Sequence, residues 1–247
     1  MKQIIINADD FGINEKVTEE IEKCIDGGMI SSTTIMANGE CLDEAVQFAK
    51  SHPHVSYGIH LCISEFDSIT KSPILKKYGL IDSQGVFVRQ QVFKIKHFNK
   101  ELKTAIREEL KAQIKIVKSY GISLSHCDSH HHAHTIYGLQ RIFADVIKEE
   151  GFTKVRILRR IETYNLFRHP ILSLKRLYVA RFYKKRFKTT NHFSSYSDYI
   201  IKTRDVNGIC ELMCHPGHGK YRAEYEMVLN KTALSDSNVK LITYNEL

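Results

Sequence analysis

The stretch KQIIINADDFG at residues 2–12 opens the chain with a short β-branched apolar run that meets two adjacent aspartates, Asp9 and Asp10. A continuous apolar run of this length is typical of a strand buried on both faces, as in a parallel sheet. Two carboxylates that follow such a strand are costly to bury unless a cation or hydrogen bonds satisfy them. The sequence therefore predicts a buried strand over residues 2–8 followed by a site loop.

Strand-like and helix-like segments alternate beyond this run. We expect strands at residues 2–8, 32–37, 55–63, 123–128, 153–158, 210–214 and 239–244. We expect helices at residues 14–26, 42–50, 100–120, 137–150 and 197–207, and a long loop or inserted hairpin at 64–96. Repeated strand–helix units predict an α/β protein with parallel strands. Our first interpretation is a closed or partly closed, TIM-barrel-like (β/α) barrel in a single domain, residues 1–247, and the second is an open doubly wound sheet.

The composition is that of an ordinary globular protein, with 247 residues, 43% hydrophobic and 26% charged. These values exclude disordered and collagen-like chains. No apolar run approaches the ~18 residues of a membrane span, and polar residues from Asn7 onward interrupt the start too early for a signal peptide. Six cysteines without a CxxC pair indicate reduced thiols, so we expect a cytoplasmic protein. No glycine-rich dinucleotide or P-loop motif is present.

The net charge of +8 comes from one region of the chain. Between residues 154 and 188 lysines and arginines are frequent and Glu162 is the only acid, so the remainder is slightly acidic. We expect a basic helical insertion at about 159–190, with basic residues over much of its helix and an apolar side formed by Ile171, Leu174, Leu177, Tyr178 and Phe182. It is interpreted as a solvated face of a helix covering the barrel, as a lid for an anionic sugar, or as a contact with an acidic membrane surface.

Polar residues recur where the expected strands end. Because the carboxyl ends of parallel strands meet on one face of the fold, these side chains are expected to converge there. They are Asp9, Asp10, His60, Asp128, His130 and His215.

Five of the ten residues from 125 to 134 are histidine. In an extended conformation Asp128, His130 and His132 share one face, and His131 points away. A solvated histidine loop is the alternative interpretation. A set of one aspartate and two histidines with open coordination positions suits a catalytic divalent ion.

Five ordered motifs resemble the YdjC-like (ChbG-type) carbohydrate deacetylase family. They are NADDFG at 7–12, STTIMANG at 32–39, GIHL at 58–61, DSHHHAH at 128–134 and HPGH at 215–218. The resemblance implies an irregular (β/α) barrel that removes acetyl groups from N-acetylated sugars such as chitooligosaccharides. Such an enzyme is an amidohydrolase acting on linear amides.

The resemblance also implies roles for individual residues. The ligands of one divalent ion, magnesium or zinc, would be Asp10, His60 and His130. Asp9 would be the general base and His215 the acid. Asp128 would hold the tautomer of a histidine, and Arg156 would orient the substrate or the base.

Two other functions stay open at this point. One is a different (β/α)-barrel metallohydrolase such as a phosphoesterase, for which His132, His134 and His218 could supply further ligands. The other is a basic protein that binds nucleic acid or a membrane, which would leave Asp9, Asp10 and His60 without a role. We expect an N-acetylated sugar as partner, with an anionic or lipid-linked form and peripheral membrane contact left open, and no nucleic acid. The sequence also leaves a homodimer open.

Overall fold

The computed structural model describes residues 2–95, 97–158, 170–202 and 207–247. Its strands are β1 (Lys2–Phe11), β2 (Ser32–Ile35), β3 (Ser56–Leu61), β4 (His126–Ser129), β5 (His192–Ser195), β6 (Ile209–Cys214) and β7 (Val239–Leu241). Its α-helices are α1 (Glu15–Asp26), α2 (Leu42–Ser51), α3 (Pro73–Lys77), α4 (Arg89–Lys94), α5 (Lys100–Ser119), α6 (Leu139–Glu149), α7 (Pro170–Lys184), α8 (Tyr196–Lys202) and α9 (Arg222–Leu229). The 3-10 turns are η1 (His130–Thr135), η2 (Gly219–Tyr221), η3 (Thr232–Leu234) and η4 (Tyr244–Glu246).

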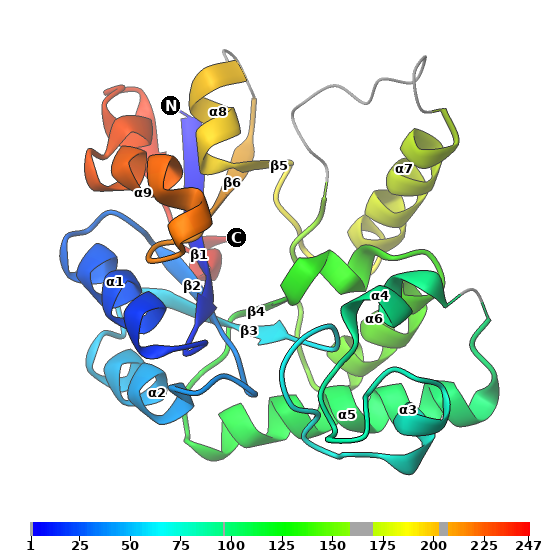
Figure 1. Cartoon of the computed structure of the whole chain (residues 1–247). Coiled ribbons are helices and arrows are strands. Elements are labelled where there is room, and N and C mark those ends of the chain that lie inside the picture. Colours follow the sequence, from blue (N-terminus) through cyan, green and yellow to red (C-terminus); the bar gives the residue numbers. More distant parts are fainter. Residues whose placement is uncertain (1, 96, 159–169, 203–206) are drawn as a thin grey trace.

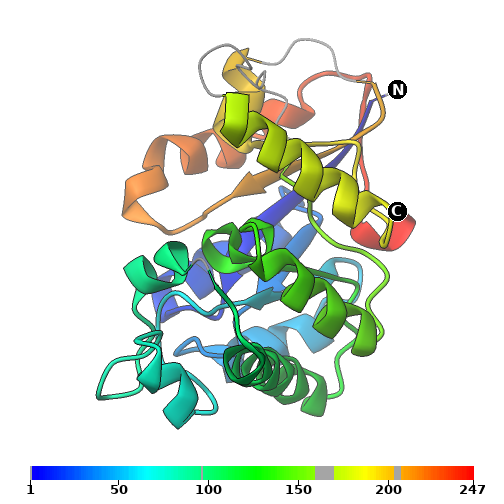
Figure 2. The same ribbon diagram turned by 90° about the vertical axis from the view of Figure 1, so that its right-hand side faces the viewer.

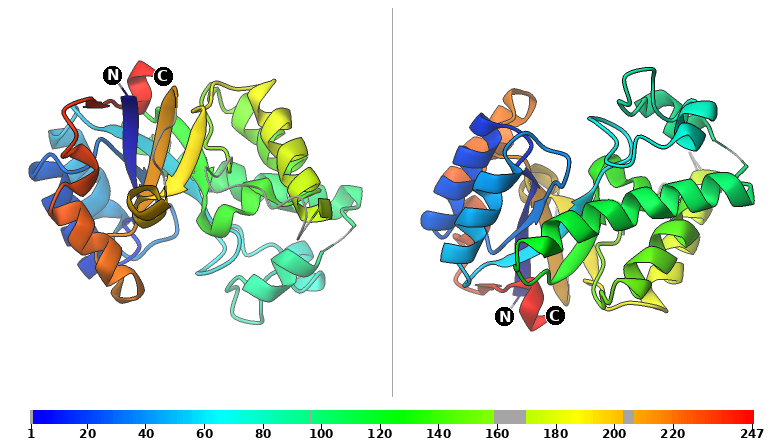
Figure 3. Two further views of the ribbon diagram at one scale, coloured as in Figure 1. Left: turned by 90° about the horizontal axis from the view of Figure 1, so that it is seen from above. Right: turned by 90° about the horizontal axis from the view of Figure 1, so that it is seen from below.

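The strands form one parallel sheet in the order β4-β3-β2-β1-β6-β5, with β1 at its centre (Figure 1). Along one edge β1 pairs with β6, and along the other it pairs first with β7 and then with β2. The sheet curls into a half-barrel with the helices outside it (Figure 3). The predicted α/β fold with a barrel-like parallel sheet is therefore confirmed, and the open doubly wound sheet is not what forms.

The two faces of the sheet differ in chemistry because side chains alternate along a strand. In β1, Ile4, Ile6 and Ala8 belong to the main apolar core, and the intervening Asn7 and Asp9 face the other side. That second face is also buried, and it carries most of the polar side chains of the sheet. They are Asn7, Asp9, Ser32, Thr34, His60, His126, Asp128 and Glu211.

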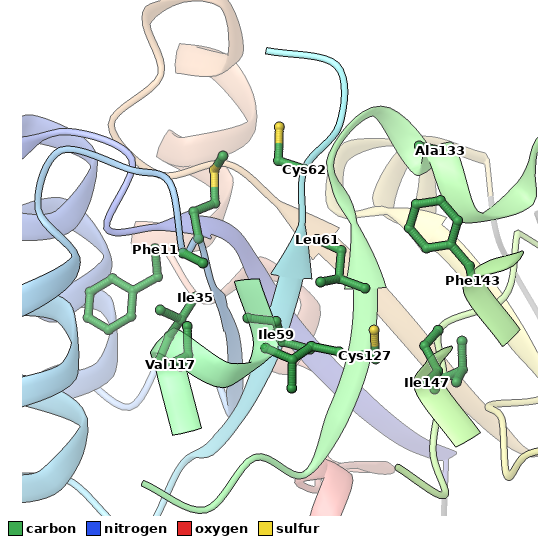
Figure 4. Close-up of a cluster of buried hydrophobic side chains, with 14 of the residues drawn as sticks. Phe11, Ile35, Ile59, Leu61, Cys62, Val117, Cys127, Ala133, Phe143 and Ile147 are labelled. Atoms are coloured by element: carbon green, nitrogen blue, oxygen red, sulfur yellow. The ribbon is translucent and has the colours of Figure 1, made fainter. Parts of the chain in front are cut away.

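The apolar face is covered by helices of matching periodicity. Figure 4 shows Ile59 and Cys127 of the sheet beside Val117 of α5 and Phe143 of α6. The long helix α5 packs against β3, with α6 and α3 as further neighbours (Figure 3). Burial of apolar surface contributes about 25 cal/mol per Å², so this contact between helices and sheet stabilises the fold.

Two glycines allow close approaches next to the site. A Cβ on Gly58 of β3 would lie 2.5 Å from the His126 ring of β4, so only glycine leaves room for that ring. Gly12 has a φ of +90°, a conformation that glycine adopts at little cost, and it turns the chain from β1 toward α1. The helix α1 then begins after Asn14, whose side chain accepts a hydrogen bond from the backbone N–H of Val17 at 3.0 Å.

Helix α7 lies along the outside of the half-barrel (Figure 2). It is held there by Tyr183, whose buried hydroxyl donates to the carbonyls of His134 at 2.8 Å and Gln140 at 3.2 Å. The expected insertion at about 159–190 lies partly outside the described residues, since 159–169 are not described. The described part forms α7 and the segment that leads to β5.

Several elements differ from the expectations. The excursion at 64–96 contains the short helices α3 and α4 as well as isolated antiparallel bridges. The strand expected at 153–158 makes only isolated bridges, which join Lys154 and Val155 to neighbouring segments. β5 and α9 were not predicted, because neither has a clear apolar periodicity in the sequence. The helix expected at 197–207 is α8, and residues 203–206 are not described.

None of the helices in the described ranges combines the length and apolarity that a membrane crossing requires.

Candidate active site

A bulge at the end of β1 lets two consecutive carboxylates reach the same region. The register of β1 against β2 shifts between Ala8 and Phe11, and Asp10 adopts a left-handed φ of 71°. Aspartate tolerates this conformation better than most residues because its short side chain bonds locally. Asp9 and Asp10 are therefore both buried at the carboxyl end of the strand, although neighbouring strand residues ordinarily face opposite sides.

Asp10 lies between two histidines, one in β3 and one in the turn that follows β4. Its Oδ1 is 3.2 Å from His60 Nε2 and 2.8 Å from His130 Nδ1. The three side chains offer donor atoms within 4.8 Å of one another, and all three are buried. Ligands bonded at about 2.1 Å to one cation are separated by comparable distances. The donor set and its spacing therefore fit a single divalent ion.

His60 is held in one orientation from behind. Its Nδ1 donates to Asp128 Oδ1 at 2.6 Å, and the Thr34 hydroxyl donates to the other carboxylate oxygen at 3.3 Å. This contact places the proton on Nδ1 and leaves Nε2 facing Asp10. A carboxylate behind a histidine is the usual arrangement for fixing the tautomer of a metal ligand. Asp128 is therefore placed where it could hold the His60 tautomer, and that role stays a prediction.

The charges of this cluster favour a cation. Burial opposes a charge on His60, but Asp128 and Asp10 raise its pKa well above the ordinary value. Burial likewise opposes a charge on His130, but Asp10 and Glu65 raise its pKa to about 10. The same negative potential that draws protons to these rings would draw a divalent ion, which would displace those protons.

Two further groups reach the cluster from loops. His218 Nε2 lies 3.1 Å from Asp10 Oδ2, and among the described residues it has no well-aligned hydrogen-bond partner. Glu65, in the loop after β3, accepts from His130 Nε2 at 2.9 Å. Glu65, His130 and His131 form a second group of potential ligands.

The carboxylate of Asp9 is bonded to a buried arginine. Arg156 donates from both terminal nitrogens to the two carboxylate oxygens of Asp9, at 2.7 and 2.6 Å. Asn7 donates a third hydrogen bond to Asp9 Oδ1 at 2.9 Å. Burial raises the pKa of Asp9, but the Arg156 charge outweighs it and holds that pKa well below its usual range. Asp9 is therefore an ionised carboxylate in a fixed orientation.

Arg156 is the centre of a buried ionic network. Besides Asp9, its guanidinium contacts Asp128 at 2.7 Å and Glu211 at 2.6 Å. The Tyr244 hydroxyl donates to the other Glu211 oxygen at 2.5 Å. Burial raises the pKa of Glu211 to about 7, although Arg156 and Tyr244 oppose this shift. Arg156 is fully buried, and its contacts with Asp9 favour the expected orientation of the base over a direct substrate contact.

His215 lies at the end of β6 in the loop that also carries His218. Its Nδ1 is 3.3 Å from Glu224 of α9, and its ring stacks on Tyr221 with centroids 4.2 Å apart. Burial lowers the pKa of His215, but Glu224, Asp9 and Asp10 raise it above the usual value. The carboxylates around His215 thus favour its charged form, as a proton donor would require.

The histidine run is not extended as expected. His131 and His132 both adopt left-handed φ values, near 51° and 55°, and the chain turns through η1. The predicted alternation of faces is therefore wrong beyond His130. His134 turns inward, where its ring contacts the Ser129 hydroxyl at 2.6 Å and the Arg156 carbonyl at 3.1 Å. His134 thus supports the fold and is not available as a ligand.

Several residues of the site were not found in the sequence. Glu211 has a recognisable signal, since it is the only charged residue in an otherwise apolar strand. Thr34 lies two residues after Ser32 in β2, so it follows the alternation of polar positions along the strand. Glu65, Glu224 and Tyr244 come from a loop, a helix and the chain end, and no local pattern connects them to the site.

Fold and site together define an α/β half-barrel protein with a buried aspartate–histidine cluster at the carboxyl ends of its strands. A family model described as YdjC-like protein matches residues 3–243. The chain belongs to this family.

Curated relatives agree with this membership, and a solved structure shares the fold. The chain is 26% identical over 264 residues to a carbohydrate deacetylase of Clostridium beijerinckii, covering 99% of this chain and 100% of that protein. It is 29% identical over 244 residues to a carbohydrate deacetylase of Vibrio cholerae, covering 94% and 89%. A crystal structure of a candidate cellobiose-phosphate cleavage protein from Enterococcus faecalis shares the fold, with a TM-score of 0.74, 22% identity and coverage of 99% and 98%.

Proposed function

We propose that this protein is a carbohydrate deacetylase that hydrolyses the N-acetyl group of an N-acetylated sugar of the GlcNAc or chitooligosaccharide type. The products are acetate and an amino sugar. The observation that carries the proposal is the convergence of Asp10, His60 and His130 with Asp9 beside them, in a chain whose relatives are named carbohydrate deacetylases.

One divalent ion, magnesium or zinc, would be held by Asp10, His60 and His130. Such an ion makes water more acidic and polarises an amide carbonyl. His218 Nε2, which faces Asp10 Oδ2 at 3.1 Å, is a further donor at the same site. The proton on His60 Nδ1, held by Asp128, keeps the opposite nitrogen free for this task.

Asp9 takes the proton of the attacking water. Arg156 keeps the Asp9 carboxylate ionised and fixes its two oxygens, at the expense of its basicity. A weak base would be sufficient here, since an ion held by Asp10, His60 and His130 would make the water more acidic. His215, whose Nδ1 is engaged by Glu224, gives a proton from Nε2 to the departing sugar nitrogen.

The test is acetate release from mono- and di-N-acetylated sugars, free and phosphorylated, with added divalent ions. The phosphorylated set shows whether an anionic form is preferred. Asp9→Asn is expected to lower kcat at least about 100-fold while divalent-ion binding by calorimetry is retained. Asp10→Asn is expected to lose both activity and divalent-ion binding. Asp82→Asn, a change at an exposed aspartate, is the control. Near-full activity of Asp9→Asn would remove the base assignment.

The second group of potential ligands, Glu65, His130 and His131, favours one alternative, a two-ion phosphoesterase. Counting bound ions separates the two functions. The deacetylase proposal expects one ion per chain and no hydrolysis of phosphate esters. Two ions together with phosphatase activity would favour the alternative.

We also propose that the protein works in the cytoplasm. All six cysteines are free thiols and five of them are buried, which supports a reducing compartment.

A further inference from the structure

The outer face of α7 exposes large apolar side chains in a row. Ile171 is 70% exposed, Leu174 60% and Tyr178 42%, and Tyr137, from the turn after η1, is 61% exposed. We call these four residues the α7 patch. On the opposite side of the helix Tyr183 is fully buried. The α7 patch is therefore separate from the side by which α7 packs against the rest of the protein.

The patch is ordered by its own contacts. The rings of Tyr137 and Tyr178 lie 5.9 Å apart, and the Lys175 ammonium lies 5.9 Å from the centre of the Tyr137 ring. Arg141 donates to the Tyr178 hydroxyl at 3.5 Å. Two tyrosines and two cations from α6, α7 and the preceding turn therefore form one continuous surface.

The surroundings of the patch are strongly basic. Residues 170–188 contain no acid. The exposed cations on and directly after α7 are Lys175, Arg176, Arg181, Lys184, Lys185 and Arg186. Where α7 ends, the surface is hollowed over about 520 Å³, and Lys148 and Lys188 join the lining of this hollow.

We propose that the α7 patch and its surrounding cations form a docking surface for an anionic phospholipid bilayer. A helix with aliphatic and aromatic residues on one side and lysines and arginines around them lies in the interface of a bilayer, with its apolar residues among the acyl chains. The cations meet the negative headgroups, and tyrosine is favoured at that depth. The basic hollow would receive headgroup phosphates.

Two other occupants fit the surface less well. A second copy of the chain meeting this face would bring two sets of cations together, which is unfavourable. A nucleic acid would satisfy the cations, but exposed Ile171 and Leu174 have no place on a phosphate backbone and cannot stack on bases. The combination of aliphatic side chains and cations favours the bilayer. The proposal does not depend on the reaction that the protein catalyses.

The experiment is co-sedimentation of the full chain with vesicles of phosphatidylcholine, alone or mixed with phosphatidylglycerol. We expect binding to the mixed vesicles only, and weaker binding as salt is added. Leu174→Glu is expected to weaken vesicle binding at least about tenfold. Leu229→Glu is the matched control, because it places the same change at an exposed leucine of α9, and it should bind as the wild type does.

Two double variants test whether vesicle binding depends on the cations around the α7 patch. Lys175→Gln with Arg181→Gln should weaken binding to the mixed vesicles several-fold. Lys103→Gln with Lys115→Gln removes the same charge from exposed positions of α5 and should have little effect. Circular dichroism checks that all variants fold.

Four outcomes would overturn the proposal. The first is no binding to the mixed vesicles at low salt. The second is an equal loss of binding in the matched controls. The third is a dimer in analytical ultracentrifugation that Leu174→Glu dissociates. The fourth is a DNA duplex bound in preference to the vesicles.

Discussion

Asp9 and Asp10 are consecutive residues with different partners. The left-handed φ of Asp10 turns its carboxylate toward His60 and His130, and Asp9 keeps the strand direction and meets Arg156. One carboxylate is thereby surrounded by imidazoles and the other by a guanidinium. This division places Asp10 in a candidate cation site and gives Asp9 a fixed orientation beside that site.

Arg156→Lys tests whether the arginine acts through Asp9. A lysine keeps the charge but cannot donate two parallel hydrogen bonds to a carboxylate. We expect kcat to fall about 10- to 100-fold because Asp9 loses its orientation, with KM little changed because residue 156 is buried away from substrate. Steady-state kinetics measures both. A raised KM with unchanged kcat would instead support direct contact with substrate.

Glu211→Gln tests the buried network through pH. With a folded pKa of about 7 against the ordinary 4.5, Glu211 holds a proton in the fold that the unfolded chain has lost. Its contribution to stability is thus complete below about pH 4.5 and is lost as pH rises through about 7. Glutamine does not titrate, so the unfolding free energy of the variant minus that of the wild type should rise by up to about 3 kcal/mol over this range. Urea titrations at several pH values measure it, with Glu108→Gln as the exposed control. A constant difference would contradict the expectation.

At the scale of elements, the site depends on close contacts between strands and on anchored loops. β3 and β4 present His60 and Asp128 side by side, as their parallel register requires. The loop after β3 brings Glu65 to His130, and it is anchored behind by Glu109 of α5. This buried carboxylate accepts hydrogen bonds from Ser68, Ile69, Thr70 and Gln113.

Gly58→Ala tests the contact between β3 and β4. The added Cβ would meet the His126 ring at 2.5 Å and a Thr34 methyl at 2.7 Å. We expect a loss of about 1–3 kcal/mol in unfolding free energy. Activity should also fall, because Thr34 supports Asp128. Gly219→Ala, in open space, is the control for thermal unfolding. Equal stability of the two variants would show that β3 and β4 separate easily.

Glu109→Ala tests the anchor of the loop. Removing the carboxylate leaves buried donors of Ser68 and Thr70 unsatisfied, and each costs about 1–3 kcal/mol. We expect a net loss of about 3 kcal/mol and faster backbone hydrogen exchange around residues 65–70. Glu108→Ala, at the exposed neighbouring position, should stay within about 0.5 kcal/mol of the wild type. Unchanged exchange would show that the loop is held by other contacts.

For the whole molecule, Asp10, His60 and His130 come from β1, β3 and the turn after β4. Residues this far apart in sequence meet only when the sheet has curled and paired in register. A ligand that binds all three side chains therefore binds the folded state and not the unfolded chain.

Divalent ions are accordingly expected to stabilise the protein. At a hundredfold excess over its Kd an ion adds about 2.7 kcal/mol, which raises the Tm of a chain this long by about 5–10 °C. Differential scanning calorimetry with and without chelator measures this shift. Asp9→Asn should retain most of it, and Asp10→Asn should lose it. An equal shift in both variants would place the ion elsewhere.

Much of this architecture follows from patterns of neighbouring residues. The apolar run at 2–8, the helical spacing at 14–26 and 100–120, and the polar residues after strands are local features, and each appears in the structure. β5, with four residues, and α9, with little amphipathic periodicity, lack such features and were missed. The turn at His131 and His132 contradicts the predicted extended conformation. It was missed because hydrophobic periodicity does not indicate two successive residues with left-handed φ values.

The chain order of apolar and polar residues was therefore sufficient to indicate parallel strands, a barrel-like sheet and the face on which Asp9, Asp10, His60 and His130 would meet. It could not indicate that Arg156 is buried among three carboxylates, that Glu65 reaches His130, or that Tyr244 at the end of the chain supports Glu211. Periodicity depends on the few residues within one turn or one strand, whereas these contacts join segments tens to hundreds of residues apart. They exist only because the curl of the sheet brings those segments together.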